Sequence, residues 1–354
     1  MQIYSTSVKN TLKLHHQSFI VDGHADTFWR IAMRTKSKHR YFRSAIADFF
    51  QNIKKAQTGT ITKTHIDYQR LKDGGMNLQF MAIYTPPKFT CNSATTFALK
   101  MLFEILYAIK QSKNQINLIK SSNDLNQAIK KDSITFLISI EGGNPLNQNL
   151  SLLEVFYQLG VRAMGLTHNP HNDLGDGIGV KKPRGLTAFG KTVVKEMNRL
   201  GMIIDVAHLA KPGFNDVIKL SDSPIISSHT GVKSLIDIPR NVDDEQIKEI
   251  ARCNGVIGIF YIPQYLKKFT RKKDTATVKD VVNHIEYVAD KVGVDYVGLG
   301  SDFDGYGGIT YGLEDISCLP NLTDELVKRG FHQTEIKKIL GGNFIRVIKN
   351  ILTR

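Results

Sequence analysis

Eight short runs of apolar residues recur along the chain, and each is almost continuously hydrophobic. A strand that is buried on one face alternates apolar with polar residues, whereas a strand of a parallel sheet is covered on both faces and does not alternate. The continuous pattern therefore predicts eight buried, parallel strands. They are expected at residues 18–23, 76–85, 134–140, 161–167, 202–207, 224–228, 256–262 and 296–300.

Segments with helical periodicity fill most of the intervals between these runs. The clearest are residues 95–113, 152–160, 188–201, 243–255 and 277–293, and a last helix is expected over residues 333–352. Strands that alternate with helices are typical of the α/β class, and eight such units predict a (β/α)₈ barrel of the TIM type. The chain has 354 residues, and a barrel of this kind can occupy all of them. We therefore predict a single domain over residues 1–354.

Two segments depart from this alternation and are predicted to be loop excursions from the barrel. Residues 34–63 are long, basic and weakly patterned, and residues 263–276 carry a run of lysine and arginine. They contribute to a formal net charge of +14, which raises the question of nucleic-acid binding. We favour a solvated basic surface over that function. Attraction of anionic substrates towards the mouth of the barrel is a third interpretation of the same charge.

The cysteines and the apolar runs also bear on the compartment in which the protein works. Cys91, Cys253 and Cys318 are scattered and form no CxxC pair, so we expect neither a disulfide framework nor a cysteine-rich zinc module. No run reaches the roughly 18 apolar residues of a membrane-spanning helix, and the N-terminal residues lack the apolar core of a signal peptide. We therefore predict a cytoplasmic protein with no membrane or nucleic-acid partner.

Most of the predicted strands end in residues that can bind a metal ion or move a proton. These residues are His24 and Asp26 after the first strand, Glu141 after the third, His168, His208 and His229 after the fourth to sixth, and Asp302 and Asp304 after the eighth. In a barrel the carboxyl ends of the strands converge on one mouth, where catalytic groups collect. Side chains two residues apart on a strand face the same way, so His24 and Asp26 are expected to bind one ion together.

The combination of residue types at these strand ends favours a metal site. Imidazoles and carboxylates are the ligands that zinc and similar divalent ions prefer. Any one of these histidines taken alone is more often structural, but their joint placement at strand ends favours ligation. His24, His208 and His229 with one aspartate and one glutamate exceed what a mononuclear site uses. Two ions that share a bridging carboxylate would use them all.

The same residues lie in segments that resemble the membrane (renal) dipeptidase family of zinc metallopeptidases, which includes soluble bacterial members. The resemblance covers about residues 18–350 and is carried by VDGHADT, THIDYQRLKDGGMNLQF, SIEGG, GVRAMGLTHNPHND, GLTAFGKTVVKEMNRLGMIIDVAH, SSHT, IPRNVDDEQI, DYVGLGSDFDG and ILGGNFIRV. HxD alone occurs in many metal-dependent hydrolases, whereas the ordered set with its spacing is specific. It implies a hydrolase that binds two zinc ions, cleaves dipeptides, tolerates a D-residue at the C-terminal position and often forms homodimers.

The resemblance also implies a role for each candidate residue. His24 and Asp26 would bind one zinc ion, His208 and His229 would bind the other, and Glu141 would bridge the two. His168 and Arg240 would contact the substrate, and Asp302 would act as the acid/base. Tyr265 aligns less securely with a tyrosine of the substrate pocket.

Each implied role has a chemical reason. Two metal ions can hold a bridging hydroxide at neutral pH and polarise the scissile carbonyl. A hydrogen bond from His168 could stabilise the oxyanion that forms on attack. Asp302 could accept the proton of the hydroxide and return it to the leaving amine. Arg240 offers a planar fork that suits the terminal carboxylate of a dipeptide.

Two of these assignments have alternatives that the sequence leaves open. Arg240 lies just before a predicted helix and could instead form a salt bridge with Asp243 or Asp244. Asp304 is a rival to Asp302 as the acid/base, because both follow the same strand and could face the same way. Only the resemblance favours Asp302.

Residues 185–192 match the nucleotide-binding pattern GxxxxGK[ST]. That motif functions when a buried strand leads into the glycine loop and a helix begins at its end. The preceding segment, GDGIGVKKPR, is polar and rich in glycine, so the pattern lacks this context. The hydroxyl of Thr187 is instead expected to cap a helix that begins just after it, which would place Gly190 and Lys191 inside the first turns.

Together these observations predict a binuclear zinc dipeptidase. The nearest alternative is another binuclear metal amidohydrolase that acts on N-acyl amino acids or cyclic amides. A nucleotide-binding or nucleic-acid-binding protein that uses Lys191 or the basic loops is the alternative from a different class.

Overall fold

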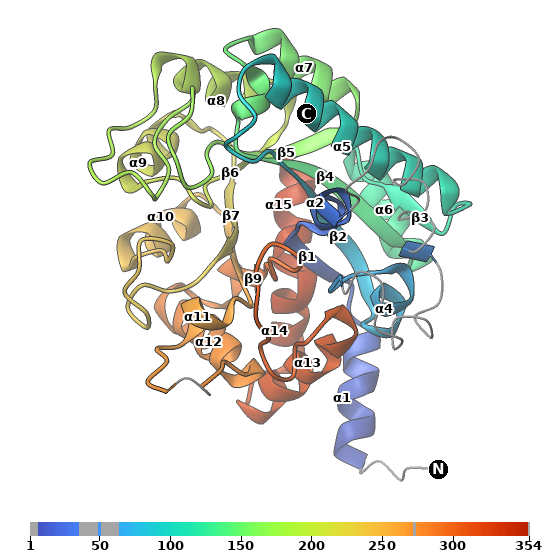
Figure 1. Cartoon of the computed structure of the whole chain (residues 1–354). Helices are drawn as coiled ribbons and strands as arrows, with labels where there is room; N and C mark the ends of the chain where they lie inside the picture. Colours follow the sequence, from blue (N-terminus) through green and yellow to red (C-terminus); the bar gives the residue numbers. More distant parts are fainter. Residues whose placement is uncertain (1–5, 35–48, 51–63, 272–273, 353–354) are drawn as a thin grey trace.

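Parallel strands form the centre of the molecule, and eight of them close into a barrel (Figure 1). The structure is a computed structural model that describes residues 6–34, 49–50, 64–271 and 274–352. Its strands are β1 (Ile20–Ala25), β2 (Met76–Tyr84), β3 (Ile116–Leu118), β4 (Ile134–Glu141), β5 (Val161–Gly165), β6 (Ile203–Asp205), β7 (Ile225–Thr230), β8 (Val256–Ile259) and β9 (Val297–Leu299). All eight predicted strands are confirmed, and the (β/α)₈ barrel with them.

Pairing between β2 and β4 closes the ring. The other neighbours follow the order β2-β1-β9-β8-β7-β6-β5-β4, and every pair is parallel. The strand β3 was not among the predicted strands. It lies outside this ring order and pairs with the first three residues of β4, before β4 reaches β5. This strand has only three residues, and its central Asn117 is exposed, so it lacks a continuous apolar pattern.

Helices surround the ring of strands (Figure 1). They are α1 (Thr6–His16), α2 (Thr27–Arg34), α4 (Tyr68–Asp73), α5 (Asn92–Gln111), α6 (Ser122–Lys131), α7 (Leu150–Gln158), α8 (Ala188–Leu200), α9 (Lys211–Leu220), α10 (Asp244–Arg252), α11 (Pro263–Leu266), α12 (Val278–Val292), α13 (Leu319–Lys328), α14 (Gln333–Lys337) and α15 (Asn343–Ile351). The five predicted internal helices are confirmed as α5, α7, α8, α10 and α12, with ends shifted by a few residues.

The last predicted helix is divided in the structure. A π-helical turn (Lys338–Gly342) joins α14 to α15. Gly341 in this turn lies so close to β1 that a Cβ atom there would come within 2.1 Å of the carbonyl oxygen of Phe19. A glycine allows this approach, which brings the end of the chain against the barrel.

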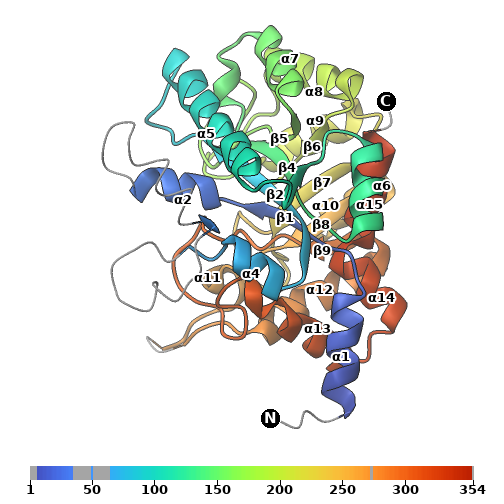
Figure 2. The same ribbon diagram turned by 90° about the vertical axis from the view of Figure 1, so that its right-hand side faces the viewer.

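The helix α15 plugs the amino-terminal end of the barrel. Figure 1 looks into the ring of strands and shows α15 through it, and Figure 2 shows α15 at the end of the barrel opposite α2 and α11. One apolar cluster joins strand residues to this helix. Its strand members are Val21, Leu78, Phe80, Leu137, Ala163, Ile203, Ile226 and Val256, and its members from α15 are Phe344, Val347, Ile348 and Ile351. The opposite end, where the strands finish, is the mouth.

The segment with the nucleotide-binding pattern forms an ordinary helix start. Thr187 caps α8 as predicted, because its hydroxyl oxygen accepts a hydrogen bond of 2.9 Å from the backbone nitrogen of Gly190. A Cβ atom at Gly190 would lie 2.0 Å from the carbonyl oxygen of Leu174, so close packing explains this glycine. Helix capping by Thr187 and the close packing of Gly190 therefore explain this segment without phosphate binding.

The two predicted loop excursions are only partly visible. The excursion at 34–63 falls almost wholly outside the described residues. The excursion at 263–276 begins with α11 and lies between β8 and α12. Among the described residues, no helix combines the length and the apolarity that crossing a bilayer requires.

Replacing Phe344 by alanine should lower the free energy of unfolding by about 3–5 kcal/mol, because it leaves a cavity in the plugged end of the barrel. Chemical denaturation monitored by circular dichroism measures the change. Phe103 on α5 is a matched control because 60% of its side chain is exposed, and Phe103→Ala should change stability by less than about 1 kcal/mol. Equal losses in the two variants would contradict the role given to α15.

Candidate metal and active site

The strand ends bring the predicted site residues together at the mouth. His24 is the second-last residue of β1, and Asp26 is the first residue after this strand. Glu141 is the last residue of β4, and His229 lies in β7. His168, His208 and Asp302 lie in the segments that follow β5, β6 and β9. All of them except His168 are buried, and His168 is half-buried.

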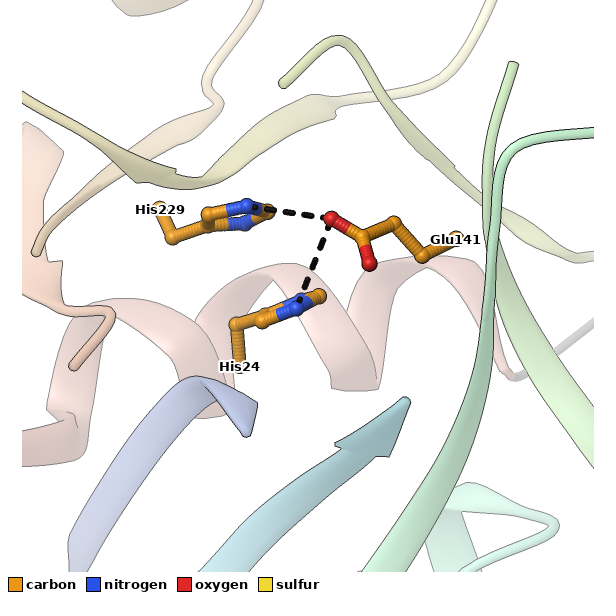
Figure 3. Close-up of side chains that lie close together, drawn as sticks. All are labelled: His24, Glu141 and His229. Atoms are coloured by element: carbon orange, nitrogen blue, oxygen red, sulfur yellow. Dashed lines mark ion pairs between the residues drawn. The ribbon is translucent and has the colours of Figure 1, made fainter. Parts of the chain in front are cut away.

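One carboxylate oxygen is the centre of this arrangement. Oε1 of Glu141 lies 3.1 Å from Nε2 of His208, 3.4 Å from Nε2 of His229 and 3.7 Å from Nε2 of His24. Figure 3 shows the rings of His24 and His229 side by side and directed at this oxygen. Nε2 of His24 also lies 3.5 Å from Oδ2 of Asp26. The carboxylate therefore faces imidazoles from β1, from β7 and from the segment after β6.

Hydrogen bonds behind two of the imidazoles set which nitrogen carries a proton. Nδ1 of His208 lies 2.7 Å from the side-chain oxygen of Asn169, which can only accept. Nδ1 of His229 lies 2.7 Å from the hydroxyl of Ser228, and this hydroxyl in turn donates to the carboxylate of Asp205. Both rings therefore carry their proton on Nδ1. Their Nε2 atoms point towards Glu141 with a lone pair that can bind a metal ion.

The carboxylates at the mouth make one another harder to ionise. Burial, followed by the charge of Asp26, raises the pKa of Glu141 well above its ordinary value. Burial also raises the pKa of Asp302 to about 7, and Asp26 contributes in the same direction. Like charges brought together in a site of low polarity disfavour ionisation. A cation bound between these groups would relieve this repulsion.

The imidazoles respond to the same surroundings in two ways. Burial opposes the charge of His24 most strongly, but the carboxylates of Glu141 and Asp26 outweigh it and raise the pKa of His24 to about 10. Burial lowers the pKa of His208 and His229 well below the ordinary value, and the charges of Arg240 and His24 add to this. The two histidines with lowered pKa are neutral, which is the form that binds metals.

The donor set fits one or more divalent metal ions. Nε2 of His24 and Oδ1 of Asp26 are buried and have no hydrogen-bond partner among the described residues. Three groups of possible ligand atoms each lie within 4.8 Å of one another, and Glu141 belongs to two of them. The groups are His24, Glu141 and His229; Glu141, His168 and His208; and His24, Asp26 and Asp302. Unpartnered buried donors around a shared carboxylate are what metal ligation would satisfy.

The comparison with known protein families identifies the chain. Residues 8–353 match the model of the membrane dipeptidase family, peptidase family M19. The chain belongs to this family. The M19 relatives include dipeptidase tcpJ of Claviceps purpurea (strain 20.1), which is 31% identical over 340 residues that span 93% of this chain and 76% of that protein.

Solved structures support both the barrel and the M19 membership. The dipeptidase AC, a metallopeptidase of family M19, superimposes with a TM-score of 0.86 at 25% identity, over 96% of this chain and all of that one. A metallopeptidase from Rhodobacter sphaeroides, bound to a phosphinate mimic of the dipeptide L-Ala-D-Ala, has a TM-score of 0.84 at 25% identity and covers 94% of this chain and 99% of its own. This chain is therefore a dipeptidase of a metallopeptidase family.

The side chain of Arg240 points towards the histidines at the mouth and not towards α10, the helix that follows it. Its Nη2 donates 2.6 Å to the carbonyl oxygen of His229 and lies 3.1 Å from Nε2 of His208. The two aspartates that the sequence offered as partners are paired with lysines. Asp243 lies 2.7 Å from Lys211, and Asp244 lies 2.7 Å from Lys291. The alternative salt bridge at the start of α10 is therefore wrong.

The two aspartates after β9 have different surroundings. The carboxylate of Asp304 accepts a hydrogen bond from the Thr27 hydroxyl and another from the backbone nitrogen of His65, each 2.7 Å long. Asp302 instead has a carboxylate oxygen within 4.8 Å of ligand atoms of His24 and Asp26. Asp304 therefore holds the loop together, whereas Asp302 faces the site.

Aromatic side chains lie beside the polar centre. The ring of Tyr84, at the end of β2, lies 4.7 Å from the ring of His168. The ring of Phe260 lies 5.8 Å from that of Tyr265, and 5.6 Å from the guanidinium carbon of Arg240. Tyr265 is half-buried on α11. Phe260 thus packs beneath both residues that the resemblance assigns to substrate binding.

Several residues that shape the site were not among the predicted site residues. Asn169 and Ser228 are each adjacent in sequence to a candidate histidine, and Asp205 is the last residue of β6, so their positions were the available signal. Gly305 gave no such signal. A Cβ atom there would come within 2.1 Å of Oδ1 of Asp302 and 2.4 Å of Oδ2 of Asp26, so the lack of a side chain makes room for both carboxylates.

Replacing Ser228 by alanine should weaken metal binding about 10- to 100-fold, because His229 loses the acceptor that orients its ring. Competition with a metal-binding dye on the purified protein measures the affinity. Ser227→Ala is the matched control, since the Ser227 hydroxyl is also buried but has no hydrogen-bond partner among the described residues. An equal affinity in the two variants would remove the orienting role of Ser228.

Proposed function

We propose that the protein is a zinc-dependent dipeptidase with two zinc ions at the mouth of the barrel. The observation that carries this proposal is the single oxygen of Glu141 that faces three imidazole Nε2 atoms, with Asp26 beside one of them. His24 and Asp26 would hold one ion, His208 and His229 the other, and Glu141 would lie between them. When bound, two such ions would activate a water molecule and polarise the scissile carbonyl.

The division of ligands between two ions rests on distances within the site. The Nε2 atoms of His208 and His229 are 2.9 Å apart, which suits two ligands of one ion. Nε2 of His24 lies 3.5 Å from Oδ2 of Asp26, which suits two ligands of the second ion. The rings of His24 and His229 also stack at 3.7 Å, and these two form a group with Glu141. The proposed division follows the Nε2 atoms, because they bear the lone pairs that bind metal.

Asp302 is proposed as the acid/base. Its carboxylate faces the site, with an oxygen within 4.8 Å of ligand atoms of His24 and Asp26. Burial raises the pKa of Asp302 to about 7 when no cation is bound, and a carboxylate in this place can serve first as a base and then as an acid. One of its oxygens would accept a proton from the attacking water and later return it to the nitrogen of the leaving amine. Asp304 cannot take this role without breaking its two hydrogen bonds.

His168 and Arg240 are proposed to hold the substrate. Burial, followed by the charge of Arg240, lowers the pKa of His168 to about 4, so the ring is neutral. Nδ1 of His168 is buried without a partner among the described residues and can bond the carbonyl oxygen on which charge builds. The guanidinium of Arg240 would bind the terminal carboxylate, with Tyr265 beside it.

The finer features of the proposal have separate support. Tolerance of a D-residue at the C-terminal position is suggested by the neighbour that binds a mimic of L-Ala-D-Ala. A cytoplasmic location and a homodimer are also proposed, the first because the three cysteines are free and the second from the family resemblance alone. We also propose that the protein has no nucleic-acid partner. Lys191, the lysine of the nucleotide-binding pattern, lies 3.8 Å from the carboxylate of Asp216.

A substrate panel with and without a chelator tests the proposed function. Free dipeptides should be hydrolysed, whereas dipeptides with a C-terminal amide should react poorly, because Arg240 would lose its carboxylate partner. Dialysis against a chelator should abolish turnover, and zinc should restore it with about two equivalents bound per chain. Preferential cleavage of N-acyl amino acids would favour the amidohydrolase alternative. Full activity of the metal-free protein would falsify the metal mechanism.

Replacing Asp302 by asparagine should lower kcat about 10²- to 10⁴-fold while the metal content stays unchanged, since the amide cannot accept the proton. Steady-state kinetics with elemental analysis measures both quantities. Asp304→Asn is the matched control: it changes a buried carboxylate two residues away and should keep most of the turnover. The reverse result would transfer the acid/base role to Asp304.

A further inference from the structure

The side chain of His284 forms hydrogen bonds with two segments that belong to the mouth. It lies on α12, and its side chain is fully buried. Its Nδ1 lies 2.9 Å from the backbone nitrogen of Val232, and its Nε2 lies 3.1 Å from the carbonyl oxygen of Leu266. Val232 follows β7, and Leu266 is the last residue of α11. One imidazole thus spans two segments that are more than thirty residues apart in sequence.

The two partners leave only one arrangement of the ring proton. A backbone N–H can only donate and a backbone carbonyl can only accept. Nδ1 of His284 must therefore be the acceptor for Val232, and Nε2 must carry the proton that goes to Leu266. Burial lowers the pKa of His284 to about 4, so the neutral ring persists throughout the neutral range. No other neutral side chain offers an acceptor and a donor on opposite edges of one rigid ring.

Each partner of His284 belongs to a segment that carries a proposed substrate residue. Two backbone hydrogen bonds join the ends of the loop that follows β7. The backbone nitrogen of Lys233 donates 2.8 Å to the carbonyl oxygen of Val242, and that of Val242 donates 3.0 Å to the carbonyl oxygen of Gly231. Arg240 lies within this loop, and its carbonyl oxygen accepts a hydrogen bond of 3.1 Å from the Thr230 hydroxyl. A shift of the backbone at Val232 would therefore move Arg240.

The other segment carries Tyr265, which precedes Leu266 on α11. A side-chain amide of the first segment reaches it directly, since Nδ2 of Asn241 donates 3.3 Å to the carbonyl oxygen of Tyr265. The ring of Phe260 packs against both Tyr265 and Arg240. The two segments therefore form one hydrogen-bonded unit, and α12 holds it through His284.

We infer that His284 is a positioning residue for substrate binding, which holds Arg240 and Tyr265 at a set distance through Val232 and Leu266. Neither of its two hydrogen-bond partners, Val232 and Leu266, is a proposed metal ligand or catalytic residue. The inference rests on the proposed function, because it takes Arg240 and Tyr265 to bind the dipeptide. Misplaced binding groups raise KM, whereas metal ligation and proton transfer are left in place.

Two conservative variants separate the two bonds of His284. An asparagine places its amide where Nδ1 was and can still accept from Val232, whereas a glutamine places its amide where Nε2 was and can still donate to Leu266. His284→Gln should therefore act through Arg240, and His284→Asn through Tyr265. In each variant KM for a dipeptide should rise about 5- to 50-fold while kcat changes less than about threefold and metal content is unchanged.

Double-mutant cycles on kcat/KM show whether the effect passes through the proposed residues. The loss in His284→Gln should shrink in the Arg240→Ala background, and the loss in His284→Asn should shrink in the Tyr265→Phe background. Additive losses in both cycles would overturn the inference. So would an unchanged KM, or a failure of both variants to fold, since either would assign His284 to stability alone.

His15 supplies the matched control. It is also a fully buried histidine with two partners, Thr323 at 2.7 Å and the carbonyl oxygen of Gly74 at 2.9 Å, and burial lowers its pKa to about 4 as well. It lies on α1, away from the mouth. His15→Gln and His15→Asn should lower the melting temperature without changing KM. Failure of the wild-type protein to cleave any dipeptide would instead refute the proposed function, before any variant is compared.

Discussion

The charge of Glu141 is the constraint around which the mouth of the barrel is organised. A carboxylate buried at the end of a central strand costs free energy unless other groups compensate it. Three imidazoles supply part of this compensation from β1, β7 and the segment after β6, at 3.1 to 3.7 Å from one oxygen. Two more carboxylates, Asp26 and Asp302, lie in the same space and oppose its ionisation. A cation bound at the mouth would therefore stabilise these buried carboxylates, which agrees with membership of a metallopeptidase family.

Part of the backbone at the mouth is held in a conformation that most residues avoid. His208 has a φ of 64°, in the left-handed region, where a non-glycine residue costs about 1–3 kcal/mol. Its carbonyl oxygen accepts hydrogen bonds from the backbone nitrogen of Ile178 and the hydroxyl of Thr167. The long segment after β5 thus keeps the strained residue in place and turns its ring towards Glu141. The segment therefore contributes to the site without supplying one of the proposed metal ligands.

The sequence predicted the barrel and the residues at its mouth because both follow from simple periodicities. Continuous apolar runs marked the buried strands, and the histidines and carboxylates stood at their ends. The period of two could not separate Asp302 from Asp304, and the structure shows why: both have left-handed backbones, with φ of 59° and 72°, so the alternation of a strand no longer applies. The short β3, the π-helical turn before α15 and the partners of Arg240 depend on contacts between distant segments, which no local pattern records.

The position of α15 has a consequence for how this molecule can change over generations. The apolar cluster around α15 and the mouth lie at opposite ends of the strands (Figure 2), and none of the proposed site residues belongs to that cluster. Substitutions in the loops that follow the strands can alter substrate specificity while the apolar packing around α15 continues to stabilise the fold. Because the two ends are separate, substrate specificity can change during evolution with little loss of stability. A barrel closed in this way is suited to diversification at one end alone.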